Sequence, residues 1–272
     1  MLLSTVIDDF LWDLRNRSQV SPLTLKNYTN WLKRLLAFAP NLEVKNINAK
    51  LIRRYKQYLL IFTDPMKGAR LKPITQNYHL IALRALLEYL NKQSIPAPLP
   101  EVVELLKQEH RQVNLLSFDD IRKIVEAPKS SKKEGVRDRC LLEILSCTGL
   151  LVSNIVKLNC RDISIDNLSP QANKWLETYL MSRKDTFSPL FIRFQGTIDP
   201  VANGEKMRLT PRSVERIVKK YGKKVGIKAT PQLIRESLAA NLLQSGQSIK
   251  SVQKILGHHS PSSTKVYLKS TP

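Results

Sequence analysis

Cysteine is scarce in this sequence, and its positions argue against disulfide or metal chemistry. The 272 residues include three cysteines, Cys140, Cys147 and Cys160, an odd number set among apolar neighbours. This pattern is typical of small buried side chains in a reducing compartment rather than of a disulfide framework. Because no metal-ligand spacing is present either, we expect no bound metal and no other cofactor.

Long apolar runs are also absent. No stretch reaches the roughly 20 residues that span a bilayer. The N-terminal MLLSTVIDDFLWDL carries acidic residues where a signal peptide needs basic ones. We therefore expect a cytoplasmic, nucleoid-associated protein with no membrane partner.

Acidic residues are few relative to basic ones. The chain has 23 Asp and Glu against 44 Lys and Arg, a formal net charge of +21, and residues 201–272 alone hold 14 basic and three acidic residues. A merely solvated basic surface is the alternative. So large an imbalance favours a polyanionic partner, with the phosphate contacts near the C-terminus.

Residues 1–93 have the periodicity of a helical bundle. Apolar residues recur at helical spacing in two stripes, which are Leu25, Tyr28, Leu32, Leu35 and Leu36, and then Tyr78, Ile81, Ala85, Leu86 and Tyr89. Ser21 with Pro22 and Thr24 marks the start of one helix, and Pro73 with Thr75 the start of another.

The proline-rich SIPAPLP at 94–100 ends the bundle and opens a linker over 94–114, of which 101–114 is compatible with a short connecting helix. A second domain over 115–272 begins at LLSFDDIRKIVEAP, where Ser117 caps a helix. Further helices are predicted over 137–149, 151–158, 171–182, 210–226, 230–246, 248–257 and 260–268. Strand signals are limited to SPLFIRF at 188–194 and a weaker DISI at 162–165. The predicted fold is mainly α with a reduced β-sheet.

Three polar residues near the C-terminus are presented by consecutive helical elements. In TPQLIRES at 230–237 the Thr-Pro pair is a natural helix start, which puts Gln232 and Arg235 on one helical face. Gly257 suits the left-handed position that ends a helix, and it presents His258 just beyond. The next predicted helix carries Tyr267. Taken singly, each could be a surface cation, a turn residue or a packed aromatic.

As a set, these residues resemble the C-terminal signature of the tyrosine recombinases, the phage integrase family, whose usual form reads T-P-H-x-L-R-H and then L-G-H-x-S-x-x-T-T-x-x-Y. The corresponding text here is TPQLIRES and LGHHSPSSTKVY. SPLTLKNYTNWLKRLLAFA and ITQNYHLIALRALLEYLNKQSIP are similar to the family's helical core-binding domain, so the resemblance covers almost the whole chain. It implies a core-binding domain over 1–93 and a catalytic domain over 115–272 that clamp duplex DNA between them.

The resemblance implies that Tyr267 is the nucleophile, which forms a 3′-phosphotyrosyl bond without metal, and that Arg235 and His258 are retained catalytic residues. Such a reaction passes through a transition state with excess negative charge, which fixed cations must stabilise. Two arginines, a lysine on a β-hairpin and histidines supply this stabilisation in the family.

Several of those positions are substituted here. Leu151 stands in TGLLVSN where the family has the arginine of T-G-L-R-x-S-E, Gln232 replaces the first histidine, and Glu236 replaces the second. Only Asn167 separates RDISID from LSPQANKW, whereas two strands and a turn need about a dozen residues, so the hairpin lysine is missing. We therefore predict a degenerate catalytic site.

Three functions remain open at this point. The first is a duplex-DNA-binding regulator or accessory factor with an impaired catalytic centre, which could self-associate on DNA or join a recombinase partner. The second is an active or slow recombinase in which substitute cations, Lys206, Arg193 or Lys157, rebuild the site. The third is a protein-interaction role within a recombinase assembly. Besides Arg235, the expected DNA-binding residues are Lys26, Lys72, Arg208, Arg212, Arg216 and Lys219.

Overall fold

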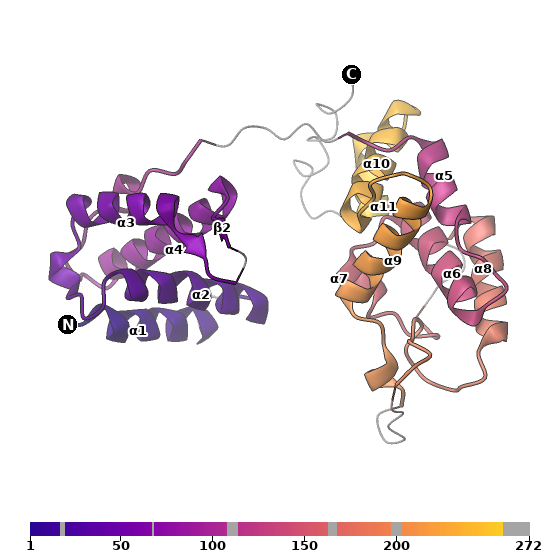
Figure 1. Cartoon of the computed structure of the whole chain (residues 1–272), viewed down its shortest axis with the longest axis horizontal. Helices are drawn as coiled ribbons and strands as arrows, with labels where there is room; N and C mark the ends of the chain where they lie inside the picture. Colours follow the sequence, from indigo (N-terminus) through magenta and orange to yellow (C-terminus); the bar gives the residue numbers. More distant parts are fainter. Residues whose placement is uncertain (17–19, 67, 108–113, 163–167, 197–202, 258–272) are drawn as a thin grey trace. The chain divides into compact units, whose positions relative to one another are not determined.

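The chain divides into two compact units, Met1–Arg111 and Gln112–Pro272. The computed structural model describes residues 1–16, 20–66, 68–107, 114–162, 168–196 and 203–257. Both units are built mainly of helices (Figure 1). Each has its own hydrophobic core, so each is described separately.

The first unit is a small helical bundle, as the apolar periodicity predicted. Its main helices are α1 (Leu3–Asn16), α2 (Pro22–Phe38), α3 (Ala49–Ile61) and α4 (Pro73–Lys92), with the short 3₁₀ turns η1 (Val44–Asn46) and η2 (Pro100–Val102). The Ser21 hydroxyl accepts from the amide of Thr24 at the start of α2, which confirms that predicted cap. The other predicted start is confirmed as well, since α4 begins at Pro73, although its N-cap residue Lys72 makes no side-chain capping bond.

Two features of this unit differ from the prediction. Strands β1 (Thr63–Asp64) and β2 (Ala69–Arg70) form an antiparallel hairpin between α3 and α4, where no strand was expected. The helix proposed over 101–114 is wrong for the part that the structure describes, because residues 103–107 are not helical.

The second unit contains α5 (Phe118–Glu126), α6 (Lys133–Thr148), α7 (Val152–Ile155), α8 (Pro170–Ser182), α9 (Pro211–Lys224), α10 (Pro231–Gln244), α11 (Ile249–Leu256) and the 3₁₀ turn η4 (Glu205–Met207). Ser117 and Asp120 form a reciprocal capping box at the start of α5, as the sequence indicated for Ser117. Helix α6 is buried on nearly every side from Gly135 to Leu145. A helix buried all round is a central element, and its C-terminal end fixes the turn at Gly149.

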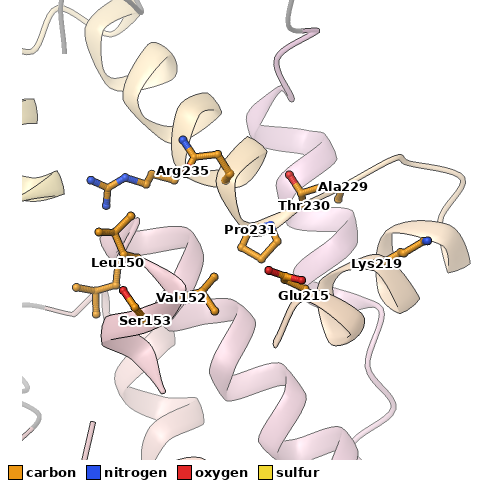
Figure 2. Close-up of a pocket in the computed structure, with 11 residues that line it drawn as sticks. Leu150, Val152, Ser153, Glu215, Lys219, Ala229, Thr230, Pro231 and Arg235 are labelled. Carbon is orange, nitrogen blue, oxygen red and sulfur yellow. The ribbon is translucent and has the colours of Figure 1, made fainter. Parts of the chain in front are cut away.

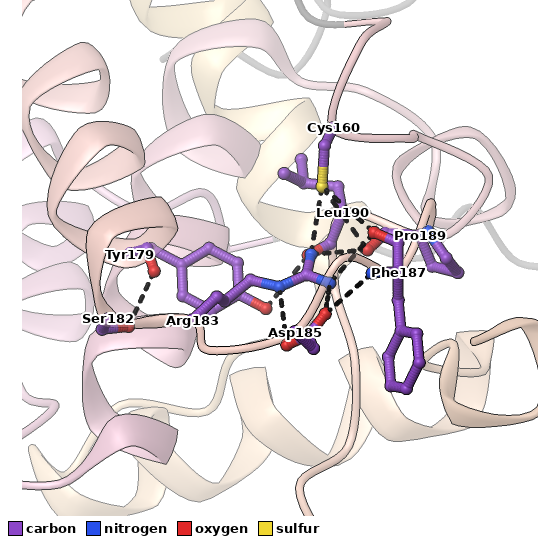
Figure 3. Close-up of polar contacts among 8 residues, drawn as sticks. All are labelled: Cys160, Tyr179, Ser182, Arg183, Asp185, Phe187, Pro189 and Leu190. Atoms are coloured by element: carbon purple, nitrogen blue, oxygen red, sulfur yellow. Dashed lines mark hydrogen bonds and ion pairs between the residues drawn. The ribbon is translucent and has the colours of Figure 1, made fainter. Parts of the chain in front are cut away.

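The predicted strand at 188–194 is replaced by an irregular segment with isolated bridges, Asn159 with Pro189 and Ile192 with Arg208. The Arg183 guanidinium holds this segment in place of a sheet ladder. It donates to the carbonyl oxygens of Phe187, Pro189 and Leu190 and pairs with Asp185 (Figure 3). The weaker strand at 162–165 lies mostly outside the described residues, as does the helix predicted over 260–268.

All three cysteines are free thiols, and only Cys140 is fully buried. Burial raises the pKa of the Cys140 thiol, which keeps it protonated. Within the described ranges, no cluster of three or more His, Cys, Asp or Glu side chains could hold a metal ion. The described helices are all too short or too polar to cross a bilayer.

Candidate catalytic pocket and nucleic-acid interface

A pocket of about 630 Å³ opens where the turn after α6 meets α9 and the start of α10. We call it the catalytic pocket, because it brings together the positions that the resemblance marks as catalytic and that the structure describes. Figure 2 shows its wall. The lining residues are Leu150, Leu151, Val152, Ser153, Glu215, Lys219, Ala229, Thr230, Pro231, Gln232 and Arg235.

Arg235 reaches this pocket from α10, but its guanidinium is committed to the fold. The Thr230 hydroxyl caps α10 by accepting from the amide of Leu233, as predicted. The side chain of Arg235 runs inward, and the residue is only 4% exposed. Its Nη1 donates to the Gly149 carbonyl oxygen, and its Nη2 donates to the Leu256 carbonyl oxygen at 2.9 Å. The guanidinium therefore ties together the C-terminal ends of α6 and α11, where the helix dipoles favour a cation.

The substituted positions lie in or beside the same pocket and add no cation to it. Leu151 is the N-cap of α7, lines the pocket, and is 44% exposed. Gln232 is exposed, and its amide donates to Glu236 Oε1 at 2.8 Å. A leucine and an amide thus occupy two positions at which the resemblance predicts charge-stabilising groups.

Lys219 is the pocket residue whose place the sequence did not predict. It was expected to contact DNA, and the structure places it with Glu215 on the wall that α9 contributes. Lys219 and Arg235 lie on opposite sides of the pocket in Figure 2, with the Glu215 carboxylate between them. The proposed substitutes Lys157, Arg193 and Lys206 do not line this pocket. The sequence could have indicated that Glu215 and Lys219 share one face of a helix, since they are four residues apart.

The other expected DNA-binding residues fall into two groups. Arg208 is tied internally, because its guanidinium donates to the carbonyl oxygens of Val156 and Leu158 and pairs with Glu205. The remaining residues are exposed, with Arg212 and Arg216 on α9 and Lys26 and Lys72 in the first unit. His258 and Tyr267 lie outside the described residues, so the structure does not place the predicted nucleophile.

The sequence matches two family models, the phage integrase SAM-like domain over residues 3–95 and the phage integrase family over residues 164–272. The tyrosine recombinase XerA of Pyrococcus horikoshii is 30% identical over 262 residues, which cover 86% of this chain and 88% of the relative. The chain belongs to the tyrosine recombinase family. The tyrosine recombinase XerD of Staphylococcus epidermidis is 26% identical over 97% of this chain and 94% of its own length.

Solved recombinase structures share the fold of this chain. A lambda integrase (75–356) dimer bound to a COC′ core site matches with a TM-score of 0.72 at 19% identity, covering 98% of this chain and 95% of that one. The Tn1549 transposon integrase in complex with transposon right end DNA matches with a TM-score of 0.71 at 16% identity, covering 98% and 94%. These likenesses confirm the predicted fold class. The segment around Leu151 lies outside the stretch that the phage integrase family model matches.

Proposed function

We propose that this protein binds duplex DNA through a recombinase fold whose catalytic pocket is impaired, and that it acts as a regulator or accessory factor rather than an efficient strand-cleaving enzyme. Residues 1–93 would form the core-binding domain, 94–114 the linker and 115–272 the catalytic-type domain. We further propose action on the nucleoid in the cytoplasm, with self-association on DNA or association with a recombinase partner. The DNA complexes among the structural relatives support this proposal.

The observation that carries the proposal is the composition of the catalytic pocket. Among the residues that the structure describes, the cations that line it are Lys219 and Arg235, and Arg235 already neutralises two helix ends. Leu151 presents an apolar surface where the family has an arginine. The Glu215 carboxylate adds a negative charge to the wall.

These substitutions act directly on the transition state. Phosphoryl transfer spreads negative charge over the equatorial oxygens, and removal of one preorganised stabiliser typically lowers the rate about 10² to 10³-fold. Losses within one catalytic unit do not simply multiply. Even a single such loss would make strand cleavage slow.

A slow recombinase is the second candidate, and the relatives favour it. The XerA and XerD relatives are named tyrosine recombinases. The phage integrase match also extends over 164–272, which includes His258 and Tyr267. Under this alternative Tyr267 forms a 3′-phosphotyrosyl intermediate, with missing cations supplied by a partner protomer.

A suicide-substrate assay separates the two candidates. The protein is incubated with nicked duplexes that carry sequence from its own genomic neighbourhood, and denaturing gels reveal any covalent adduct. We expect no adduct, together with salt-dependent gel shifts that Tyr267→Phe leaves unchanged. An adduct that Tyr267→Phe abolishes would establish the recombinase instead. Arg212→Ala is the binding control, since an exposed cation on α9 should affect only the gel shift.

A further inference from the structure

A second hollow, of about 800 Å³, lies in the same unit on another face of α9. We call it the basic hollow. Its walls come from the start of α6, the segment 193–196, the segment 206–210 and α9. Among the described residues, those that line it include six basic and two acidic side chains: Glu134, Arg137, Asp138, Arg193, Gln195, Gly196, Lys206, Arg208, Leu209, Thr210, Ser213, Arg216, Ile217 and Lys220.

The basic hollow is separate from the catalytic pocket, although α9 borders both. Glu215 and Lys219, four residues apart, line the catalytic pocket, whereas Arg216 and Lys220, also four apart, line the basic hollow. Residues at this spacing share one helix face, so the two sites occupy neighbouring faces of one helix. Arg193 and Lys206, candidates for substitute catalytic cations, line the hollow instead.

Part of the charge in the hollow is already neutralised by a buried network. Asp138, 1% exposed, accepts two hydrogen bonds from Arg137 at 3.0 and 2.6 Å and one from the Tyr221 hydroxyl at 2.9 Å. Arg137 also donates to the Ile192 carbonyl oxygen at 2.9 Å. Lys220 also lies 3.6 Å from Asp138 Oδ2 and donates to the Tyr221 hydroxyl at 3.0 Å, so Asp138 partly neutralises this second cation of the hollow as well.

Two guanidinium groups remain available at the surface of the hollow. Arg193 and Arg216 are exposed, and neither guanidinium has a hydrogen bond or ion pair within the described residues. The Arg193 guanidinium lies over Gly196, where an added Cβ would come within 3.0 to 3.2 Å of it. Within the described part of the wall, the one further carboxylate is Glu134, which is exposed at the first turn of α6.

The backbone that leads to Arg193 is fixed by hydrogen bonds. Arg183 fixes the backbone of 187–190, and the Tyr179 hydroxyl donates to the Leu190 carbonyl oxygen at 3.0 Å (Figure 3). The amide of Arg193 donates to the Met207 carbonyl oxygen at 2.7 Å, which joins the segment 187–193 to the segment 206–210. The backbone that carries Arg193 and the segment 206–210 is therefore held by contacts within the protein.

We infer that the basic hollow binds a phosphate group, held by Arg193 and Arg216 with Lys206 and Lys220 beside it. A guanidinium binds phosphate oxygens in a bidentate manner, which is why arginine is common where proteins recognise phosphate. The volume leaves room for a phosphate group that is part of a larger molecule. The phosphate group belongs either to the backbone of bound DNA or to a free phosphorylated compound. The first possibility rests on the proposed function, and the second is independent of it.

The test compares an Arg193→Ala/Arg216→Ala double variant with a Lys174→Ala/Lys250→Ala control, which removes two exposed charges outside both cavities. In the first arm, calorimetry measures binding of inorganic pyrophosphate. If the source is a free compound, wild type and control bind, and the double variant binds about tenfold more weakly or worse. In the second arm, fluorescence anisotropy measures duplex binding against salt. If the source is DNA, the slope of log K against log salt falls by about 0.9 in the double variant relative to the control, since the hollow holds one phosphate and each phosphate contact contributes about 0.9.

Either result supports the inference and names the source. The inference is overturned if the double variant matches the control in both arms. A wild-type protein that fails to bind any duplex would refute the proposed function, and the pyrophosphate arm would then decide this site alone. Circular dichroism of both variants confirms that they fold, as substitution of exposed side chains predicts.

Discussion

Replacement of Arg235 by alanine tests whether this residue has become a structural clamp. In the family signature an arginine at this position serves catalysis, but here its guanidinium bonds the Gly149 and Leu256 carbonyl oxygens and is nearly inaccessible to water. The substitution leaves the C-terminal ends of α6 and α11 without these donors. We therefore expect a loss of stability in the second unit, independent of DNA.

The size of the loss follows from the two bonds. A hydrogen bond from a charged donor contributes about 1.5 to 3 kcal/mol, and a cation at a helix C-terminus adds a few tenths to 1 kcal/mol. Two such bonds make the free energy of unfolding fall by about 4 kcal/mol. Arg235→Lys should fall between alanine and wild type, because an ammonium keeps the charge but cannot span both carbonyls in the fork geometry of arginine.

The assay is urea unfolding followed by the fluorescence of Trp175, which lies on α8 in the second unit, in a Trp12→Phe/Trp31→Phe background. The matched control is Arg212→Ala, which removes one exposed positive charge and should change stability by less than about 0.5 kcal/mol. If Arg235→Ala unfolds with the same free energy as Arg212→Ala, the clamp does not exist, and the guanidinium is available for a phosphate.

Three further predictions address other parts of the molecule. Gly149→Ala should lower the free energy of unfolding by about 2 to 4 kcal/mol, since φ is +59° and a Cβ would lie 2.6 Å from Leu256. Gly246→Ala, where φ is +87° and the space around a Cβ is open, should lower it by about 1 kcal/mol. Equal losses of the two variants in urea unfolding would contradict the packing argument. Burial lowers the pKa of His79 from 6.5 to about 4, so the unfolded chain binds more protons than the folded one between these pH values. The free energy of unfolding of the first unit should therefore fall by about 3 kcal/mol as pH falls from 6.5 to 4. His79→Gln should remove this pH dependence when unfolding is followed by the fluorescence of the tryptophans of that unit. Leu151→Arg should steepen the salt dependence of duplex binding by about 0.9, and an unchanged slope would mean that no DNA phosphate reaches the catalytic pocket.

The sequence predicted the helices well because their start and stop signals are local. Ser21, Ser117 and Thr230 cap helices as expected, and Gly149 and Gly257 adopt the left-handed conformation that ends them. Each signal acts through contacts with residues at most four positions away. Local chemistry of this kind needs no tertiary information.

The core face of α4 was predicted less well, because polar residues are buried on it. Tyr78 and Ile81 were assigned to the core stripe but are 42% and 37% exposed. The buried face instead includes Asn77 and His79, whose side chains bond the backbone of Leu106 and the Trp31 carbonyl oxygen. Burial of an amide or imidazole is tolerable only with such partners, and these partners are distant in sequence.

The candidate site was predicted in its residue types but not in its geometry. The motif indicated that Arg235 and Leu151 belong together, and both line the catalytic pocket. It could not indicate that Arg235 bonds two backbone carbonyls, since Gly149 lies 86 positions away. The irregular path of 188–194 was equally unpredictable, because its partner Arg183 replaces a strand ladder with side-chain bonds.

The separation of the two cavities explains how DNA binding can persist in the proposed function after the catalytic pocket has lost cations. Charges that bind backbone phosphates act nearly independently, so their contributions to affinity do not depend on the reacting phosphate. Catalysis, by contrast, needs several groups to converge on one phosphate, so a single loss such as Leu151 affects the whole unit. Under the proposed function, exposed Arg212 and Arg216 on α9 and Arg193 in the basic hollow would still bind backbone phosphates without contributing to strand cleavage. A repaired catalytic pocket would therefore change the rate of strand cleavage far more than the affinity for DNA.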